Sequence, residues 1–406
     1  MDLRPKDPAF GIASPLASDD DPRMNKIMTQ VALEKLPDVS AVTTSAASGD
    51  DASNHQKFQY VALIGFPSDE GTLRNGGVAG GYQGPSAFRF YLKKKGTIFN
   101  NETKEDISHM RIVDLGDVIE PYSGEEHQNL RSFKLDEPQD ENVKAVLDAA
   151  LTWDSLTSPP KLNDSGYRLE EAHLRLEGFA LRALMLGYHP FCIGGSNDQS
   201  YPNAHAALRY LRNQSALQNS KPRPLCVINI DAHLDVRPLL HGSRAHSGSP
   251  FRQLLQTEGF EGKHFVEFAA QGGQCSRNHA EYVESKGGRI YWLDQLRESA
   301  RSQGLTVPQQ FANVLDSFPS DAAIFVSFDI DSVKGCDAPG VSCPSPVGLE
   351  AWEAIEMAHT AGAHPRVILF DLSELCPKVE KDRTPLLATF MFYAYIRGRS
   401  KLGQRK

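Results

Sequence analysis

Two clusters of acidic side chains, each placed directly after an apolar run, constrain the fold of this chain more than any other feature. The apolar runs are Leu225–Ile230 and Ala323–Phe328, and the polar residues that follow them are Asp231, His233, Asp235, Asp329 and Asp331. Unbroken apolar runs of this length predict buried strands of a parallel sheet. Because alternate side chains of an extended chain share one face, the members of each cluster can converge where their strand ends.

This convergence predicts a metal centre. Four carboxylates and one imidazole at the end of a sheet would be strongly unfavourable unless cations neutralise them. Oxygen ligands with one imidazole suit a hard divalent ion such as Mn²⁺ better than an ion that prefers thiolates. Five such groups are too many for one open catalytic ion and about right for two. The residues by themselves therefore indicate a two-metal hydrolase.

Composition excludes several other classes of protein. With 406 residues, of which 40% are hydrophobic, the chain can bury a large α/β core. A net charge of -8 argues against nucleic acid or an anionic membrane as a partner, and no apolar run is long enough to span a bilayer. Six scattered cysteines without a CxxC pair, and an N-terminus without an apolar signal core, lead us to expect reduced thiols and a cytoplasmic location.

Apolar runs alternate with segments of helical periodicity along most of the chain. We expect strands at 60–67, 190–195, 225–230, 289–293, 323–328 and 367–370, and helices at 169–186, 199–212 and 346–360. This alternation predicts a parallel sheet with helices on both faces. The polar residues 1–57 are expected to be a disordered extension with one or two helical turns. The acidic, proline-containing residues 119–165 are expected to be an insertion or lid.

Four motifs occur in a defined order. They are Gly-Gly-Ser-Asn-Asp at 194–198, Asp-Ala-His-Leu-Asp at 231–235, Ser-Phe-Asp-Ile-Asp at 327–331 and Asp-Leu-Ser-Glu at 371–374. In this order and spacing they resemble the signatures of the ureohydrolase superfamily, which includes arginase, agmatinase and formiminoglutamase. Segments 69–77 and 338–344 are most similar to formiminoglutamase. The resemblance implies a three-layer α/β/α domain with a mainly parallel, arginase-like sheet over residues 58–398, followed by a basic C-terminal tail at 399–406.

The resemblance also implies a role for each polar residue. The metal ligands for two Mn²⁺ ions would be Asn197, Asp231, His233, Asp235, Asp329 and Asp331. Catalysis would involve His246, Glu374 and Asp331, and substrate binding would involve Arg237, Arg244, Arg74 and Ser247. Asn197 departs from the family, which has a histidine at this position, so one metal site is expected to be weak. Asn197 could instead only cap the helix that begins near Gln199, and Asp198 could replace it as a ligand.

The arginines indicate the class of substrate. Arginine binds carboxylates bidentately, so Arg237 and Arg244 favour a small molecule with more than one carboxylate, although either could be a surface or subunit-interface residue. N-formimino-L-glutamate, from histidine catabolism, is such a molecule, and its metal-assisted hydrolysis would release L-glutamate and formamide. His246 would protonate the departing nitrogen. Two alternatives remain open: another ureohydrolase specificity (a guanidino acid, arginine or agmatine), or a metal-poor relative without activity. The resemblance further implies a homo-oligomer, either a trimer or a hexamer.

Overall fold

The computed structural model describes residues 22–40, 59–93, 95–121 and 168–403. Within these ranges one nine-stranded sheet runs through the molecule, and all its neighbouring strands are parallel. In spatial order its strands are β1 (Met28–Gln30), β5 (Met110–Asp117), β2 (Gln59–Phe66), β6 (His189–Gly194), β11 (Val367–Ser373), β10 (Ala323–Asp329), β7 (Leu225–Ile230), β8 (Phe265–Ala270) and β9 (Arg289–Trp292). Strands β3 (Phe99–Asn100) and β4 (Glu105–Asp106) form a separate antiparallel pair.

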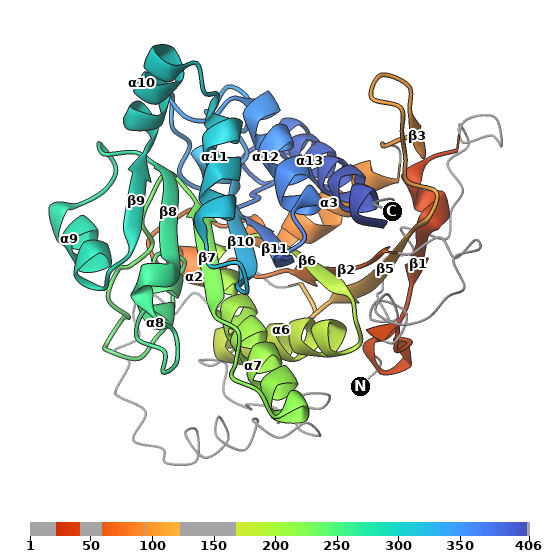
Figure 1. Cartoon of the computed structure of the whole chain (residues 1–406). Coiled ribbons are helices and arrows are strands. Elements are labelled where there is room, and N and C mark those ends of the chain that lie inside the picture. Colours follow the sequence, from red (N-terminus) through yellow and green to blue (C-terminus); the bar gives the residue numbers. More distant parts are fainter. Residues whose placement is uncertain (1–21, 41–58, 94, 122–167, 404–406) are drawn as a thin grey trace.

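Helices cover both faces of the sheet. Their bounds are α2 (Glu70–Arg74), α3 (Gly84–Leu92), α6 (Arg168–Met185), α7 (Ser200–Gln218), α8 (Pro250–Leu254), α9 (Arg277–Ser285), α10 (Leu293–Gln303), α11 (Val307–Ser317), α12 (Ala351–Ala363) and α13 (Arg383–Ser400). Figure 1 shows α3, α11, α12 and α13 on one face, and α6 and α7 on the other. The predicted three-layer α/β/α fold with a mainly parallel sheet is therefore confirmed.

Alternate residues of a strand enter two different cores. In β2, Val61 and Leu63 pack into the core under α3 and α13, whereas Ala62 and Ile64 pack into the core under α6 and α7. All four side chains are fully buried. Burial on both faces explains why the central strands are unbroken apolar runs. None of the helices in the part of the chain that the structure describes has the length and apolar composition needed to cross a bilayer.

The sheet order brings the polar motifs together. Strands β6, β11, β10 and β7 are consecutive neighbours, and each carries one of the predicted polar clusters at its carboxyl end or just after it. The register aligns Phe328 with Ile230 and Asp329 with Ser373, so these strands end at nearly the same level. Parallel sheets bind ligands at the carboxyl ends of their strands, and here four such ends converge.

The predicted disorder of residues 1–57 is wrong for residues 22–40. Strand β1 pairs in parallel with Ile112–Asp114 of β5 and so extends the sheet at its edge. Met24, Leu33 and Leu36 are buried against the domain. These few apolar side chains cannot form a core by themselves, and they are ordered by a surface that only the folded domain provides. Residues 1–21 and 41–57 lie outside the described residues, as does most of the lid predicted at 119–165.

The C-terminal tail predicted at 399–406 is also corrected. Helix α13 continues to Ser400, and a short 3₁₀ turn follows at Lys401–Gly403. Arg399 is buried, and one of its guanidinium nitrogens donates a hydrogen bond to the carbonyl oxygen of Val367 at 2.7 Å. A basic residue therefore belongs to the core here, because its charged end reaches a backbone acceptor. Residues 404–406 lie outside the described residues.

Candidate active site

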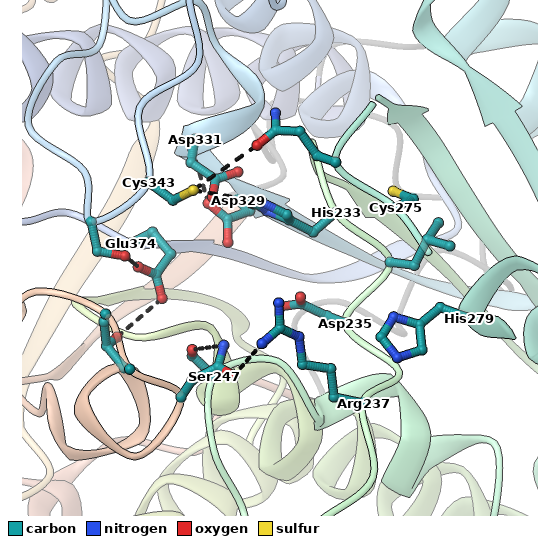
Figure 2. A pocket seen from close by; sticks show the side chains of 17 residues that line it. His233, Asp235, Arg237, Ser247, Cys275, His279, Asp329, Asp331, Cys343 and Glu374 are labelled. Atoms are coloured by element: carbon teal, nitrogen blue, oxygen red, sulfur yellow. Dashed lines mark hydrogen bonds and ion pairs between the residues drawn. The ribbon is translucent and has the colours of Figure 1, made fainter. Parts of the chain in front are cut away.

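A pocket of about 240 Å³ opens at the carboxyl ends of the central strands (Figure 2). Its lining includes four of the predicted metal ligands, His233, Asp235, Asp329 and Asp331, and three other predicted site residues, Arg237, Ser247 and Glu374. Residues from segments 72–77, 274–279 and 342–343 line other parts of the wall. The structure thus brings together side chains that are up to about 300 positions apart in the sequence (Thr72 and Glu374 are hydrogen-bonded).

Two groups of side chains in this region could each hold a metal ion. One consists of Asp231, His233 and Asp331, the other of Asp231, Asp235 and Asp329, and in each group the donor atoms lie within 4.8 Å of one another. Asp231 belongs to both groups. A shared carboxylate is what a two-ion centre with a bridging ligand requires, so the donor set fits two hard divalent ions.

The charge of this cluster also fits bound cations. Burial, followed by the charge of Asp231, raises the pKa of Asp235 well above its ordinary value; burial and the charge of Asp331 do the same to the pKa of Asp329. The charge of Asp331 is the main cause that raises the pKa of His233. Oxygen Oδ1 of Asp331 is buried without a hydrogen-bond partner among the described residues. A buried acceptor without a donor is costly, and a cation would satisfy it.

Neighbouring amides orient Asp231, the residue common to both candidate ligand groups. Its Oδ1 accepts the backbone N–H of His233 at 2.7 Å, and its Oδ2 accepts the side-chain amide of Asn229 at 3.2 Å. The same amide donates to Glu267 of β8 at 2.9 Å. Burial, then the charge of Asp231, raises the pKa of Glu267 well above its usual value. Burial thus favours the neutral form of this carboxyl group, which lies behind the candidate metal ligands.

Asn197 joins the cluster through its nitrogen atom. Its Nδ2 donates to Asp235 at 2.7 Å, while its Oδ1 accepts hydrogen bonds from Ser200 and Ser373 at 2.9 and 2.8 Å. The side chain makes no cap on α7, since no side-chain hydrogen bond caps that helix. Oxygen Oδ1 would become a metal ligand only after the amide turns over, which places Nδ2 against the two serines.

Glu374 is held from three directions. Its Oε1 accepts the backbone N–H of Asn197 at 3.0 Å and the Thr72 hydroxyl at 3.2 Å, and its Oε2 accepts the Ser342 hydroxyl at 3.0 Å. Burial, followed by the charge of Asp331, raises the pKa of Glu374 to about 8. A cationic substrate group beside it would favour the ionised carboxylate.

The backbone is strained at two of these residues. Glu374 has φ 62° and Asp235 has φ 42°, the left-handed region that residues other than glycine rarely adopt. Each such conformation costs about 1 to 3 kcal/mol and persists where the surrounding structure enforces it. Both residues line the pocket, so the strain coincides with the candidate site.

A model of the arginase family matches residues 59–396, which is most of the chain. The chain belongs to the arginase family. Among characterised relatives, it is 32% identical to a formimidoylglutamase of Geobacillus thermodenitrificans over 266 residues, which cover 63% of this chain and 75% of the relative. The region matched by the family model includes every motif that carries the candidate site.

Solved structures of this family are similar over nearly the full length. Formiminoglutamase from Trypanosoma cruzi with two Mn²⁺ ions is 38% identical and has a TM-score of 0.66; the match covers 94% of this chain and 99% of that one. A variant of that protein in which an asparagine is replaced by histidine, also with two Mn²⁺ ions, has a TM-score of 0.67 at 37% identity and the same coverage.

Two arginines predicted to bind substrate in this arginase-family chain lie outside the pocket lining. Arg74 donates to both carboxylate oxygens of Glu170, at 2.9 and 3.2 Å, and to Glu70 at 2.5 Å. Nitrogen Nε of Arg244 lies 3.0 Å from Oε1 of Glu170. Both arginine side chains are almost fully buried, with 5% and 7% exposed. A carboxylate of the protein itself therefore occupies the position that the sequence suggested for a carboxylate of the substrate.

His246 is likewise turned away from the pocket. It is buried, its Nε2 lies 3.0 Å from the carbonyl oxygen of Pro238, and its Nδ1 accepts the backbone N–H of Gly248 at 3.2 Å. Burial is the first cause that lowers its pKa. The next residue, Ser247, lines the pocket instead. Adjacent side chains of this loop point in different directions, and sequence alone did not indicate which one faces inward.

Several pocket residues were not predicted. They are Thr72, Asn75, Gln274, Cys275, His279, Ser342 and Cys343. Asn75 lies in the glycine-rich segment and Cys343 in the segment after the second aspartate pair, both of which the sequence had marked as similar to formiminoglutamase. His279, on α9, belongs to no motif. The imidazole of His279 has no hydrogen-bond partner among the described residues, and Figure 2 shows it beside Arg237.

Proposed function

We propose that this chain is a two-metal hydrolase that converts N-formimino-L-glutamate and water to L-glutamate and formamide. The observation that carries the proposal is one pocket where three features meet. Its wall carries the other members of two candidate metal-ligand groups that share the buried Asp231, together with the carboxylate of Glu374 and the cation of Arg237. A site that combines them can bind an amidine at one end and a carboxylate at the other. The similarity to the Trypanosoma cruzi formiminoglutamase with two Mn²⁺ ions supports the same reading.

The metal ligands in this proposal are Asp231, His233, Asp235, Asp329 and Asp331. Asn197, which contacts Asp235, would be an additional weak metal ligand. Two hard divalent ions such as Mn²⁺, when bound, polarise the amidine and supply a nucleophilic water at neutral pH. The unpartnered Oδ1 of Asp331 can accept a hydrogen bond from that water.

Glu374 orients the reacting group. Three hydrogen bonds fix its carboxylate, so it can accept N–H groups of the formimino cation without reorganising. Water adds to the formimino carbon, the bond from that carbon to the glutamate nitrogen breaks, and this nitrogen leaves with a proton. The proton donor is open between His279, which lines the pocket, and His246, which would have to leave its backbone partners.

Arg237 and Ser247 are the predicted substrate-binding residues that face the pocket. A guanidinium binds a carboxylate with charge assistance, and this favours an acidic substrate over agmatine, which has no carboxylate. Arg74 and Arg244 would support the loops around the site through Glu170 instead of touching substrate.

A product assay on purified, Mn²⁺-loaded protein tests the proposal. The substrates are N-formimino-L-glutamate, arginine, agmatine and a guanidino acid, and the assay measures formamide and urea. We expect formamide from N-formimino-L-glutamate and little urea from the others. Release of urea would assign another ureohydrolase specificity, and a protein that binds no metal and forms neither product would be a non-catalytic relative.

We also propose a cytoplasmic homo-oligomer, a trimer or hexamer, acting in histidine catabolism. The basis is the family likeness and the absence of any helix suited to a membrane within the described ranges. Sedimentation of the purified protein tests the oligomeric state, and microscopy of a tagged chain tests the location.

A further inference from the structure

One side chain of the pocket wall links two substrate-facing residues. Oxygen Oδ1 of Asn75 accepts a hydrogen bond from Nη1 of Arg237 at 3.1 Å, and Nδ2 of Asn75 donates to the Ser247 hydroxyl at 3.0 Å. All three residues line the pocket. Figure 2 shows Arg237 and Ser247 on the same side of the pocket.

The backbone around this link is itself tied together. The N–H of Ser247 donates to the carbonyl of Gly71 at 3.0 Å, and the N–H of Arg237 donates to the carbonyl of Gly248 at 2.8 Å. The N–H of Asn75 donates to Gly71 at 3.1 Å, which fixes Asn75 at the end of α2. Two segments distant in sequence, 71–75 and 237–248, thus hold the two ends of the link at a set separation.

Gly248 leaves the space that the link needs. A Cβ atom at this position would lie 2.9 Å from Nδ2 of Asn75 and 3.0 Å from Cδ of Arg237. These distances are shorter than ordinary van der Waals contact, so any other residue would push the two side chains apart. The φ of Gly248 is not in the left-handed region, so the constraint is steric.

The charge of Arg237 remains available in this arrangement. Its guanidinium is exposed, it has no ion-pair partner in the described part of the chain, and Asn75 is its hydrogen-bonding partner there. Asn75 is neutral, so it holds the guanidinium without cancelling its charge. Arg74 and Arg244, by contrast, are paired with Glu170.

We propose that Asn75 is a positioning residue for substrate specificity: it holds Arg237 and Ser247 so that they bind a carboxylate of an acidic substrate. This inference rests on the proposed function. A free arginine side chain loses rotamer entropy when it binds a ligand, and a partner that orders it beforehand lowers that loss. An aspartate at position 75 would fit the same space but would compete with the substrate for Arg237.

The test compares substrates with and without carboxylates on Mn²⁺-loaded protein. For Asn75→Ala, KM for N-formimino-L-glutamate should rise about three- to tenfold, the effect of losing one neutral hydrogen bond, with kcat nearly unchanged. For Asn75→Asp, KM should rise about tenfold or more, because the new charge pairs with Arg237. Hydrolysis of N-methylformamidine, which lacks carboxylates, should change in neither variant.

Two further variants separate positioning from folding. Gly248→Ala should reproduce the KM effect of Asn75→Ala, and Gly272→Ala serves as its control, because a Cβ atom at Gly272 meets nothing within 4 Å. In the Arg237→Ala background, Asn75→Ala should raise KM by less than it does in the wild type, because only its contact to Ser247 is left to lose. Binding of L-glutamate, measured by calorimetry, should weaken in parallel with the rise in KM.

The outcomes are distinct. If the wild-type protein forms no formamide from N-formimino-L-glutamate, the proposed function fails. If the wild-type protein is active but both Asn75 variants keep its KM and its affinity for L-glutamate, the inference about Asn75 fails alone. An equal loss on both substrates, or an undiminished effect of Asn75→Ala in the Arg237→Ala background, would mean that Asn75 acts on the fold or the metal centre instead.

Discussion

The side-chain amide of Asn197 donates a hydrogen bond to the carboxylate of Asp235, with 2.7 Å between nitrogen and oxygen. This contact places Asn197 inside the metal-ligand cluster, but its nitrogen faces the acidic residues and its oxygen faces the hydroxyls of Ser200 and Ser373. Metal binding through this residue therefore requires a half-turn of the amide and new contacts to both serines.

The first prediction concerns that half-turn. Asn197→His should tighten the weaker of two Mn²⁺ sites by about tenfold or more, because an imidazole is a stronger ligand for the ion than a neutral amide oxygen. Calorimetric Mn²⁺ titration of both proteins measures the effect. Ser373→Ala is the companion variant, since it removes one donor that holds Oδ1 away from the cluster. Identical weak-site constants in all three proteins would show that Asn197 is not a ligand.

The second prediction separates the shared ligand from an unshared one. Asp231→Ala should remove both ions, because Asp231 belongs to both ligand groups, whereas Asp329→Ala should retain one ion with weakened affinity. Elemental analysis after dialysis gives the metal content. Either change should abolish formamide release, and chelation should lower the Tm of the wild-type protein, since the ions bind only the native state. Turnover by either variant would contradict the two-metal mechanism.

The third prediction contrasts two arginines. Arg237→Ala should lower kcat/KM for N-formimino-L-glutamate. The corresponding loss of transition-state stabilisation should be about 1.5 to 3 kcal/mol, the range for a hydrogen bond to a charged group, with little change in the free energy of unfolding. Arg244→Ala should instead lower the free energy of unfolding by roughly 1 to 3 kcal/mol, because Glu170 loses one of its two buried cations. Urea denaturation and steady-state kinetics on both variants give the two quantities. The reverse pattern would restore Arg244 as a substrate ligand.

The fourth prediction concerns proton transfer. If His246 keeps its backbone contacts during turnover, His246→Ala should destabilise the loop but lower kcat by no more than about tenfold. Loss of a general acid would lower kcat much further. His279→Ala tests the histidine that lines the pocket. The measurement is the pH dependence of kcat in both variants. A loss of about a hundredfold or more in His246→Ala alone would show that its ring turns into the pocket during catalysis.

The fifth prediction concerns pH and stability. Burial raises the pKa of Asp371 on β11 to about 7, against hydrogen bonds such as that from Asn203 at 2.8 Å. The pKa of this carboxyl group is higher in the folded state than in the unfolded state. Its contribution to the free energy of unfolding is therefore most favourable below about pH 4 and is lost as the pH rises to about 7. Asp371→Asn should remove this loss. The free energy of unfolding of the variant, relative to that of the wild type, should therefore be larger at about pH 7.5 than at about pH 5. Urea denaturation at both values checks it, and a constant difference would show that Asp371 does not titrate in this range.

The apolar periodicity of the sequence was sufficient to predict the central strands of the sheet. Strands β2, β6, β7, β10 and β11 were predicted close to their observed bounds, because buried parallel strands are apolar on both faces. Helix α6 was predicted from apolar spacing, and it ends at Met185, shortly before Gly187, whose φ of 87° suits the turn after a helix. Strands β5 and β8 were missed, since Asp114, Gly116 and Glu267 interrupt their apolar pattern.

Those interruptions are explained by contacts far away in the sequence. Asp114 pairs with the buried Arg89 at 2.8 Å, and Glu267 accepts the amide of Asn229. Polar groups are tolerated inside a strand when a partner satisfies them, and no local pattern reveals that partner. The ordering of residues 22–40 has the same origin, since β1 needs the edge of β5 to form hydrogen bonds.

For the candidate site, the sequence determined which residues supply chemistry, and the tertiary structure decided which of them face one another. The convergence of the five candidate metal ligands was predictable because they lie at strand ends, where the chain direction is set by the sheet. The loop residues were not, because a one-position change in direction places Ser247 in the pocket and His246 outside it, and because Glu170 takes up Arg74 and Arg244. Charge pairing between distant segments stabilises one loop arrangement over the others. A local stretch of sequence does not show this pairing, because it contains only one of the two partners.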